Sequence, residues 1–194
     1  MLYKNPLQLL IATILSAQCT DVRVNKVTPL LFSRYQKPED FADADIDELQ
    51  RLIHSTGFYR NKAKSIKGAT HKISTEFNGR VPHTMEELLT LPGVARKTAN
   101  VVLGTGFGIS AGIVVDTHVF RLSHRMGLVE GKTPEQVEKQ LLNLIPKKYW
   151  IEFSHILIYH GRKVCSARNP QCNTCVVKHQ CPKIGIDLSK VKQQ

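Results

Sequence analysis

Residues 91–108 read LPGVARKTANVVLGTGFG and contain the most informative turn of the chain. Pro92 and Gly93 form a turn between two segments with helical apolar spacing. A helix that begins just after such a turn leaves backbone N–H groups without partners, and these can hold a phosphate at the positive end of the helix dipole. The stretch therefore favours a helical hairpin that binds a nucleic-acid backbone without reading sequence. Alone it is only moderately specific, because similar turns also serve as plain connections between helices.

Helical signals continue on both sides of this hairpin, and no alternating strand pattern accompanies them. Asn5 and Pro6 mark a helix start, residues 84–87 and 133–136 form capping boxes, and a last helix is expected over residues 150–159, ending at Gly161. We predict an all-α fold of roughly ten short helices. The glycine-rich residues 104–112 are the best candidate for a junction between two lobes.

Composition indicates a globular protein with a polyanionic partner. Of its 194 residues, 42% are hydrophobic, and 27 Lys and Arg against 16 Asp and Glu give a net charge of +11. Nucleic acid is the leading partner, an anionic membrane face is the lesser one, and a charge that serves solubility is the alternative. Glycines and polar residues interrupt the longest uncharged run, residues 98–115, so no transmembrane span is expected. The first ten residues lack the features of a secretory signal, so we expect a cytoplasmic, nucleoid-associated protein.

Four cysteines, Cys165, Cys172, Cys175 and Cys181, lie close together near the C-terminus. Their density predicts a common centre, for which three forms compete: a [4Fe–4S] cluster, a structural zinc ion or two disulfides. Zinc sites usually pair two short C-x2-4-C knuckles, and only one is present in this sequence. A cytosolic location disfavours disulfides. The fifth cysteine, Cys19, is expected to be an ordinary buried thiol on an apolar helix.

Two polar residues beside these motifs are candidates for catalysis. Lys97 lies in the first turn after the hairpin and is either a phosphate contact or a nucleophile, which must be neutral to attack. If Lys97 is not the nucleophile, Lys62 and the N-terminal amine are the next candidates. Asp116 precedes a helical segment, so it is expected to be an N-cap, and a capping carboxylate can also take part in catalysis.

The sequence resembles the endonuclease III family of helix-hairpin-helix DNA glycosylases. The resemblance lies in LPGVARKTANVVLGTGFG, then VVDTHVFRLSHR, then the four-cysteine pattern, in the family's order and at about its spacing. It extends over nearly the whole chain through LLIATILSAQCTDVRVNK and TGFYRNKA. The resemblance implies a six-helix barrel with the hairpin over residues 1–109, a cluster domain over residues 110–194, and an active-site cleft between them.

The resemblance also assigns roles to individual residues. Lys97 corresponds to the catalytic lysine that forms a Schiff base with the sugar, and Asp116 to the catalytic aspartate. The four C-terminal cysteines correspond to the ligands of a [4Fe–4S] cluster. Two further groups correspond to DNA-binding residues. The side chains that enter the duplex beside a flipped base are Gln18 and Phe58. The phosphate-binding hairpin consists of Pro92, Gly93, Val94 and Ala95.

Two features depart from the family pattern. Ala95 replaces the hairpin's second glycine, so its backbone must avoid positive φ or tolerate strain there. The connection between Lys97 and Asp116 is one residue longer than usual, which affects how the two are brought together.

The resemblance thus implies a monomeric DNA glycosylase/AP lyase that removes oxidised pyrimidines from double-stranded DNA and cleaves abasic sites. The nearest alternative is a monofunctional mismatch glycosylase that excises adenine or thymine, although such relatives usually have Ser or Tyr in place of Lys97. A non-enzymatic DNA-binding module held together by zinc is the alternative from another class.

Overall fold

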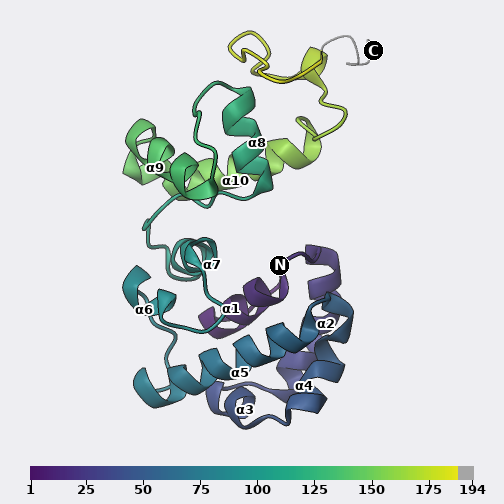
Figure 1. Ribbon diagram of the computed structural model, residues 1–194, viewed down its shortest axis with the longest axis vertical. Helices are drawn as coiled ribbons and strands as arrows, with labels where there is room; N and C mark the ends of the chain where they lie inside the picture. Colours follow the sequence, from purple (N-terminus) through teal and green to yellow (C-terminus); the bar gives the residue numbers. More distant parts are fainter. Residues whose placement is uncertain (188–194) are drawn as a thin grey trace. The chain divides into compact units, whose positions relative to one another are not determined.

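The computed structural model describes residues 1–187, and all regular structure in that range is helical (Figure 1). The all-α prediction is therefore confirmed. Contacts divide the chain into two compact units, Met1–Ile109 and Ser110–Gln194, with the division inside the glycine-rich stretch. Within the described range, no helix is both long enough and apolar enough to cross a membrane.

The first unit contains seven α-helices and two short irregular helical turns, which follow one another along the chain as α1 (Pro6–Leu15), α2 (Asp21–Arg34), α3 (Pro38–Asp43), α4 (Ile46–Ile53), η1 (His54–Thr56), α5 (Tyr59–Glu76), α6 (Met85–Leu89), α7 (Arg96–Val101) and η2 (Val102–Gly106). The longest of them, α5, contacts α3, α4 and α1. Almost every side chain of α1 is buried. These two helices therefore form the centre of the unit. Each buried aliphatic side chain there contributes about 1.5–3 kcal/mol to the free energy of folding.

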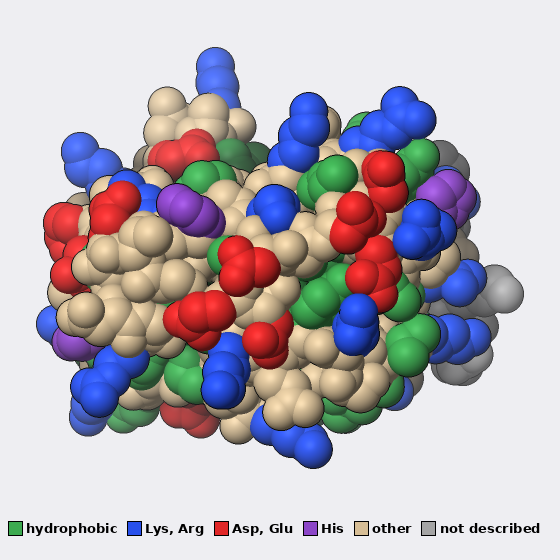
Figure 2. Space-filling view, turned by 90° about the horizontal axis from the view of Figure 1, so that it is seen from below, with side chains coloured by type: hydrophobic (Ala, Val, Ile, Leu, Met, Phe, Trp, Pro, Cys, Tyr) green, Lys and Arg blue, Asp and Glu red, His purple; other side chains and the backbone are tan. Residues whose placement is uncertain are grey.

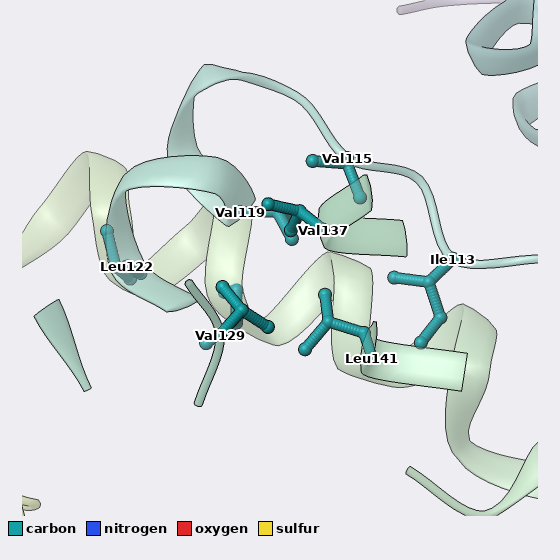
Figure 3. Close-up of a cluster of buried hydrophobic side chains, with 8 residues drawn as sticks. Ile113, Val115, Val119, Leu122, Val129, Val137 and Leu141 are labelled. Atoms are coloured by element: carbon teal, nitrogen blue, oxygen red, sulfur yellow. The ribbon is translucent and has the colours of Figure 1, made fainter. Parts of the chain in front are cut away.

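The second unit, as far as residue 187, contains three α-helices and two short turns: α8 (Thr117–Arg125), α9 (Pro134–Leu144), η3 (Lys147–Tyr149), α10 (Trp150–Lys163) and η4 (Cys172–Thr174). Its core is a cluster of aliphatic side chains from α8, α9, α10 and the segments before α8 and α9 (Figure 3). Val119 and Leu122 of α8 meet Val137 and Leu141 of α9 in this cluster, and all four are fully buried. This packing fixes the start of α8, where Asp116 lies.

Three predicted helix starts agree with the structure, and each of the three is set by a local side-chain cap. The side chain of Asn5 accepts a hydrogen bond from Gln8 N at the start of α1. Thr84 and Thr133 cap α6 and α9 in the same way. Such caps satisfy N–H groups that the helix itself leaves unpaired.

Two sequence-based expectations were wrong. Gly161 does not end the last helix, which continues to Lys163. It is needed instead for close packing, since a Cβ there would lie 2.9 Å from His118 Cδ2. Cys19 is not on a helix but in the turn between α1 and α2, where it is only half-buried.

The positive charge is divided unevenly between the units. From residue 110 to residue 194 the sequence has 13 Lys and Arg against 6 Asp and Glu, so this part carries +7 of the total +11. Figure 2 shows one face of the molecule, on which basic and acidic side chains are interspersed. The excess charge is therefore not concentrated on that face.

Candidate functional site

The turn between α6 and α7 requires a glycine at position 93. Gly93 has φ +76°, which is unfavourable for residues with a side chain. A Cβ at this position would also lie 2.5 Å from Cβ of Ser65 on α5. The hairpin backbone therefore lies directly on α5, and the turn can take only one form.

The next two residues complete the turn. The N–H group of Val94 donates to the carbonyl of Leu91 at 3.1 Å, and the Val94 side chain is buried, so Val94 anchors the hairpin from inside. Ala95 is the N-cap of α7 with an extended backbone, φ −91° and ψ 170°. Of the two expected possibilities, Ala95 therefore avoids positive φ and is not strained, so a second glycine is unnecessary. Pro92 and Gly93 are exposed at the tip of the turn.

Lys97 is the second residue of α7, and its side chain is exposed. It therefore lies in the first turn of the helix, where unpaired N–H groups create a positive end. The side chain of Ala95 makes no capping hydrogen bond to these groups. Lys97 and the tip of the hairpin thus lie on the same short segment of the first unit.

Asp116 is the N-cap of α8 in the second unit, as predicted. Its Oδ1 accepts hydrogen bonds from the backbone N–H groups of His118 and Val119, at 2.8 and 2.9 Å. Its Oδ2 lies 3.0 Å from Nδ1 of His118. The carboxylate is 16% exposed, so it is held in one orientation while remaining accessible. Capping therefore uses one oxygen, and the other faces an imidazole.

Sequence reasoning did not identify His118 as a partner of Asp116. The signal was available, because a histidine two residues after an N-cap aspartate can bring its ring to the free carboxylate oxygen. The packing that holds this ring comes from Gly161 on α10, whose absent side chain makes room for His118. That contact joins residues far apart in the sequence and could not be read from a local pattern.

Gln18 and Phe58 lie in two separate turns of the first unit, and both have a left-handed backbone. Gln18 lies between α1 and α2 with φ 52°, and Phe58 immediately precedes α5 with φ 48°. Both residues are exposed, Phe58 to 65%. A left-handed backbone is unusual for residues with a side chain, and an exposed phenyl ring gains no burial energy to offset it. Such local strain is characteristic of functional positions.

The four C-terminal cysteines line a single pocket. Cys165, Cys172, Cys175 and Cys181 surround about 330 Å³ of empty space, which includes space open to solvent. All four are half-buried and none is in a disulfide. Burial raises the pKa of the Cys172 thiol, and the other three cysteines raise it further. Cys172 therefore lies near the other three cysteines, and a bound cation would stabilise its thiolate.

The number of these thiols matches the number of ligands that a four-iron cluster takes. Among residues 1–187, no group of three or more Cys, His, Asp or Glu side chains is placed to hold one metal ion. A tetrahedral zinc site needs its thiolates at about 2.3 Å from one point, whereas a four-iron cluster takes one thiolate on each iron and needs the sulfurs spread around a cavity. Cys165, Cys172, Cys175 and Cys181 line one pocket and are therefore candidate ligands for such a cluster.

Polar groups of the second unit surround the thiols. The Arg125 guanidinium donates to Cys165 Sγ at 3.3 Å and to the carbonyls of Ser166 and Ala167 at 2.7 and 2.8 Å. The Arg125 carbonyl in turn lies 3.5 Å from Cys181 Sγ. One residue of α8 therefore holds the first and the last cysteine of the pattern. His160 Nε2 lies 3.6 Å from Cys175 Sγ.

Comparison with known proteins agrees with this architecture. Residues 11–147 match the family model described as "HhH-GPD superfamily base excision DNA repair protein". Fold and hairpin together therefore define a helix-hairpin-helix protein of base excision DNA repair. A protein of Synechocystis sp. named "Endonuclease III" is 61% identical over 180 residues, which cover 93% of this chain and 82% of that protein. The chain belongs to the endonuclease III family.

Two solved structures have the same fold. One is described as "Structure of a non-covalent Endonuclease III-DNA Complex"; its TM-score is 0.89 at 46% identity, over 94% of this chain and 85% of that one. The other is described as "Structure of a Trapped Endonuclease III-DNA Covalent Intermediate: Estranged-Adenine Complex". Its TM-score is also 0.89, at 45% identity, over 94% of this chain and 86% of that one.

Proposed function

We propose that this protein is a bifunctional DNA glycosylase/AP lyase, which removes oxidised pyrimidines from duplex DNA and cleaves the resulting abasic strand. The observation that carries the proposal is an exposed lysine, Lys97, in the first turn after a phosphate-binding hairpin in a member of the endonuclease III family. A lysine there has the chemistry to form a covalent intermediate with the sugar of DNA. One structural relative is described as a trapped covalent intermediate with DNA.

The proposed reaction begins when the damaged nucleotide leaves the base stack. Flipping costs a few kcal/mol and less for a damaged pair, which contributes to selectivity. The neutral Lys97 amine attacks C1′, the bond between C1′ and the base breaks, and the base leaves with the electron pair and a proton. Opening of the sugar ring then gives an imine between Lys97 and C1′. Loss of a C2′ proton breaks the C3′–O bond and cuts the strand on the 3′ side.

Asp116 is proposed to assist these proton transfers and to stabilise the positive charge that develops on the sugar. Its Oδ1 is used by the α8 backbone, so Oδ2 is the oxygen proposed to act. The contact with His118 holds this oxygen in place between turnovers. A carboxylate that caps a helix is already oriented, so the reaction does not need to order it.

DNA binding is proposed to combine two kinds of contact. The hairpin residues Pro92, Gly93 and Ala95, with Val94 supporting them from inside, bind phosphates, and the exposed side chains of Gln18 and Phe58 fill the space left by the flipped nucleotide. The basic second unit adds attraction to the backbone without regard to sequence. We further propose that the protein acts in the cytoplasm on chromosomal DNA.

The four cysteines are proposed to hold a [4Fe–4S] cluster. The cluster, when bound, supplies a rigid cross-link for residues 163–183, a segment with four basic side chains and no acidic one. Arg125 stabilises this loop from α8 through its contacts with both ends of the cysteine pattern. The loop would then present its lysines and arginines to phosphates.

Borohydride trapping tests the proposed nucleophile. With an abasic duplex, reduction should convert the transient imine into a stable protein–DNA adduct, visible on a denaturing gel. Lys97→Gln should abolish both the adduct and strand cleavage, yet bind the abasic duplex within about tenfold of wild type, since one such contact contributes only ~1 kcal/mol. Lys139→Gln, which removes an exposed lysine of α9, is the matched control and should be trapped normally.

Substrate choice tests the rest of the proposal. Duplexes with thymine glycol, uracil, an abasic site or a G·T mismatch are incubated with the protein and run on a denaturing gel. Cleavage of the thymine glycol and abasic duplexes is expected. Excision from the G·T mismatch without strand cleavage would instead indicate the monofunctional mismatch glycosylase.

A further inference from the structure

Lys62 is a lysine that the proposed reaction does not use, and its side chain is buried to 5% exposure. It is the fourth residue of α5, and its Nζ donates to two backbone carbonyls, of Leu15 at 2.8 Å and of Thr56 at 2.7 Å. The sequence alone makes Lys62 an alternative nucleophile. Its burial and its two hydrogen bonds give it another task.

An ammonium group is an unfavourable choice for such a place unless its several donors are needed. Burial lowers the pKa of Lys62, and the neighbouring Cys19 thiol opposes that shift. Both hydrogen-bond partners are neutral carbonyls rather than carboxylates, so no opposite charge at these contacts compensates for the desolvation. An apolar side chain would avoid this cost but could not connect two carbonyls.

The two carbonyls lie at the bases of two turns. Leu15 is the last residue of α1, whose terminal carbonyls have no partner inside the helix, and the chain then enters the turn that contains Gln18. Thr56 ends η1 and is followed by Gly57, with φ 69°, and by Phe58. Lys62 is also tied to the second turn through its backbone, since its N–H donates to the Phe58 carbonyl at 3.1 Å.

We propose that Lys62 is a positioning residue that holds the Gln18 turn and the Phe58 turn at one fixed spacing, so that both side chains enter the duplex together beside a flipped nucleotide. This inference rests on the proposed function, which assigns the two exposed side chains to that task. Because one ammonium group donates to both bases, neither turn can shift without breaking a buried hydrogen bond. The strained φ angles of Gln18 and Phe58 are thus maintained before DNA arrives.

Lys67 provides a matched control on the same helix. Its Nζ donates to the carbonyl of Ala44, the C-cap residue of α3, at 2.6 Å. The contact is of the same kind as that of Lys62 with Leu15, an α5 lysine that donates to a carbonyl at a helix C-terminus, but Lys67 is half-buried and makes one such bond instead of two. It involves neither of the two turns that contain Gln18 and Phe58. Its removal therefore measures what the loss of a lysine–carbonyl hydrogen bond on α5 does when neither turn is affected.

The experiment measures the affinity of each variant for two duplexes, one intact and one with a tetrahydrofuran abasic analogue. Lys62→Met fills the site without donors and should weaken abasic binding about tenfold, the equivalent of losing about 1.4 kcal/mol, while intact-duplex binding changes less than about twofold. Lys67→Met should change neither affinity. The fluorescence of 2-aminopurine placed opposite the abasic site gives an independent readout of side-chain entry, and its response should be reduced in Lys62→Met only.

A double mutant decides whether Lys62 acts through Phe58. Phe58→Ala should weaken abasic binding, and adding Lys62→Met should cause little further loss, because a spacing has no value once the inserted ring is gone. Full additivity of the two losses would overturn the inference. So would an unchanged preference for the abasic duplex in Lys62→Met.

Two further results separate the remaining outcomes. Circular dichroism checks folding, and if Lys62→Met is unfolded, Lys62→Gln takes its place, since an amide can still donate to a carbonyl and should give a smaller loss of the same kind. If the wild-type protein itself shows no preference for the abasic duplex, the proposed function is wrong and the inference falls with it. If the wild-type protein prefers the abasic duplex and the Lys62 variants keep that preference in full, the inference about Lys62 is wrong and the proposed function stands.

Discussion

Asp116 and His118 are joined by a hydrogen bond of 3.0 Å between Oδ2 and Nδ1, while the other oxygen of Asp116 caps α8. One oxygen thus serves the structural task of capping, and the other is left for the chemical task proposed above. Each oxygen has its own partners, and a single conservative substitution can affect the two tasks differently.

Asp116→Asn is expected to slow base removal by ~10²–10⁴, the usual value of a lost acid/base group, while the protein folds normally. Asn is as good an N-cap as Asp, because its Oδ1 can accept the same two backbone hydrogen bonds. Single-turnover excision from a thymine glycol duplex measures the first effect and thermal unfolding the second. Asp116→Ala is the control, since it should also lower stability by about 1 kcal/mol. Near-normal activity of Asp116→Asn would mean that the residue only caps.

Gly93→Ala is expected to destabilise the protein and to weaken binding to every duplex alike. An alanine there combines an unfavourable φ, which costs roughly 1–2 kcal/mol, with a clash against Ser65 on α5. Gly108→Ala is the matched control, because Gly108 has φ +69° and nothing within 4 Å of the added Cβ. Thermal unfolding of the two variants should therefore differ by the clash alone. Equal stability would show that the hairpin does not lie tightly on α5.

The protein is expected to contain about four irons per chain, because four cysteines are the ligand count of a cubane cluster. It should then be brownish, with broad visible absorption. Cys172→Ser should lose this absorption and destabilise the second unit, because cluster binding and folding are coupled. Metal analysis of protein prepared without air exposure is the measurement. One zinc per chain and no iron would contradict the assignment.

Binding to intact duplex is expected to be weak and to depend steeply on salt. Each neutralised phosphate contributes about −0.9 to the slope of log affinity against log salt, so three to five contacts give roughly −3 to −4.5. Titrations of one duplex at several salt concentrations provide the slope. A value near zero would mean that the net charge of +11 serves solubility instead.

Much of the fold could be predicted because helix starts are local events. Asn5, Thr84 and Thr133 each accept a hydrogen bond from the N–H group three residues later, so the sequence shows both partners at once. The role of Gly93 could also be anticipated, since a Pro-Gly turn before a helix is a local signal. The motifs that predict the site are of this short-range kind.

The remaining features depend on contacts between distant parts of the chain. Gly161 looks like a helix stop in the sequence and is in fact a point of close packing against His118. Lys62 cannot be told from a surface lysine until Leu15, 47 positions earlier, is placed beside it. Cys19 follows an apolar helical run, which predicts a helix there, but the cap that Thr20 provides for the next helix is the stronger determinant.

Because Gly161 has no side chain, α10 leaves room for the His118 ring and so affects Asp116 without contacting it. A Cβ at position 161 would lie 3.0 and 2.9 Å from Cβ and Cδ2 of His118, so a larger residue there would press on the ring that contacts Asp116. Natural or engineered variation at this position would then appear as an enzyme that is present in normal amounts and repairs poorly. The packing of α10 is thereby linked, through one glycine, to the carboxylate that is proposed to act in catalysis.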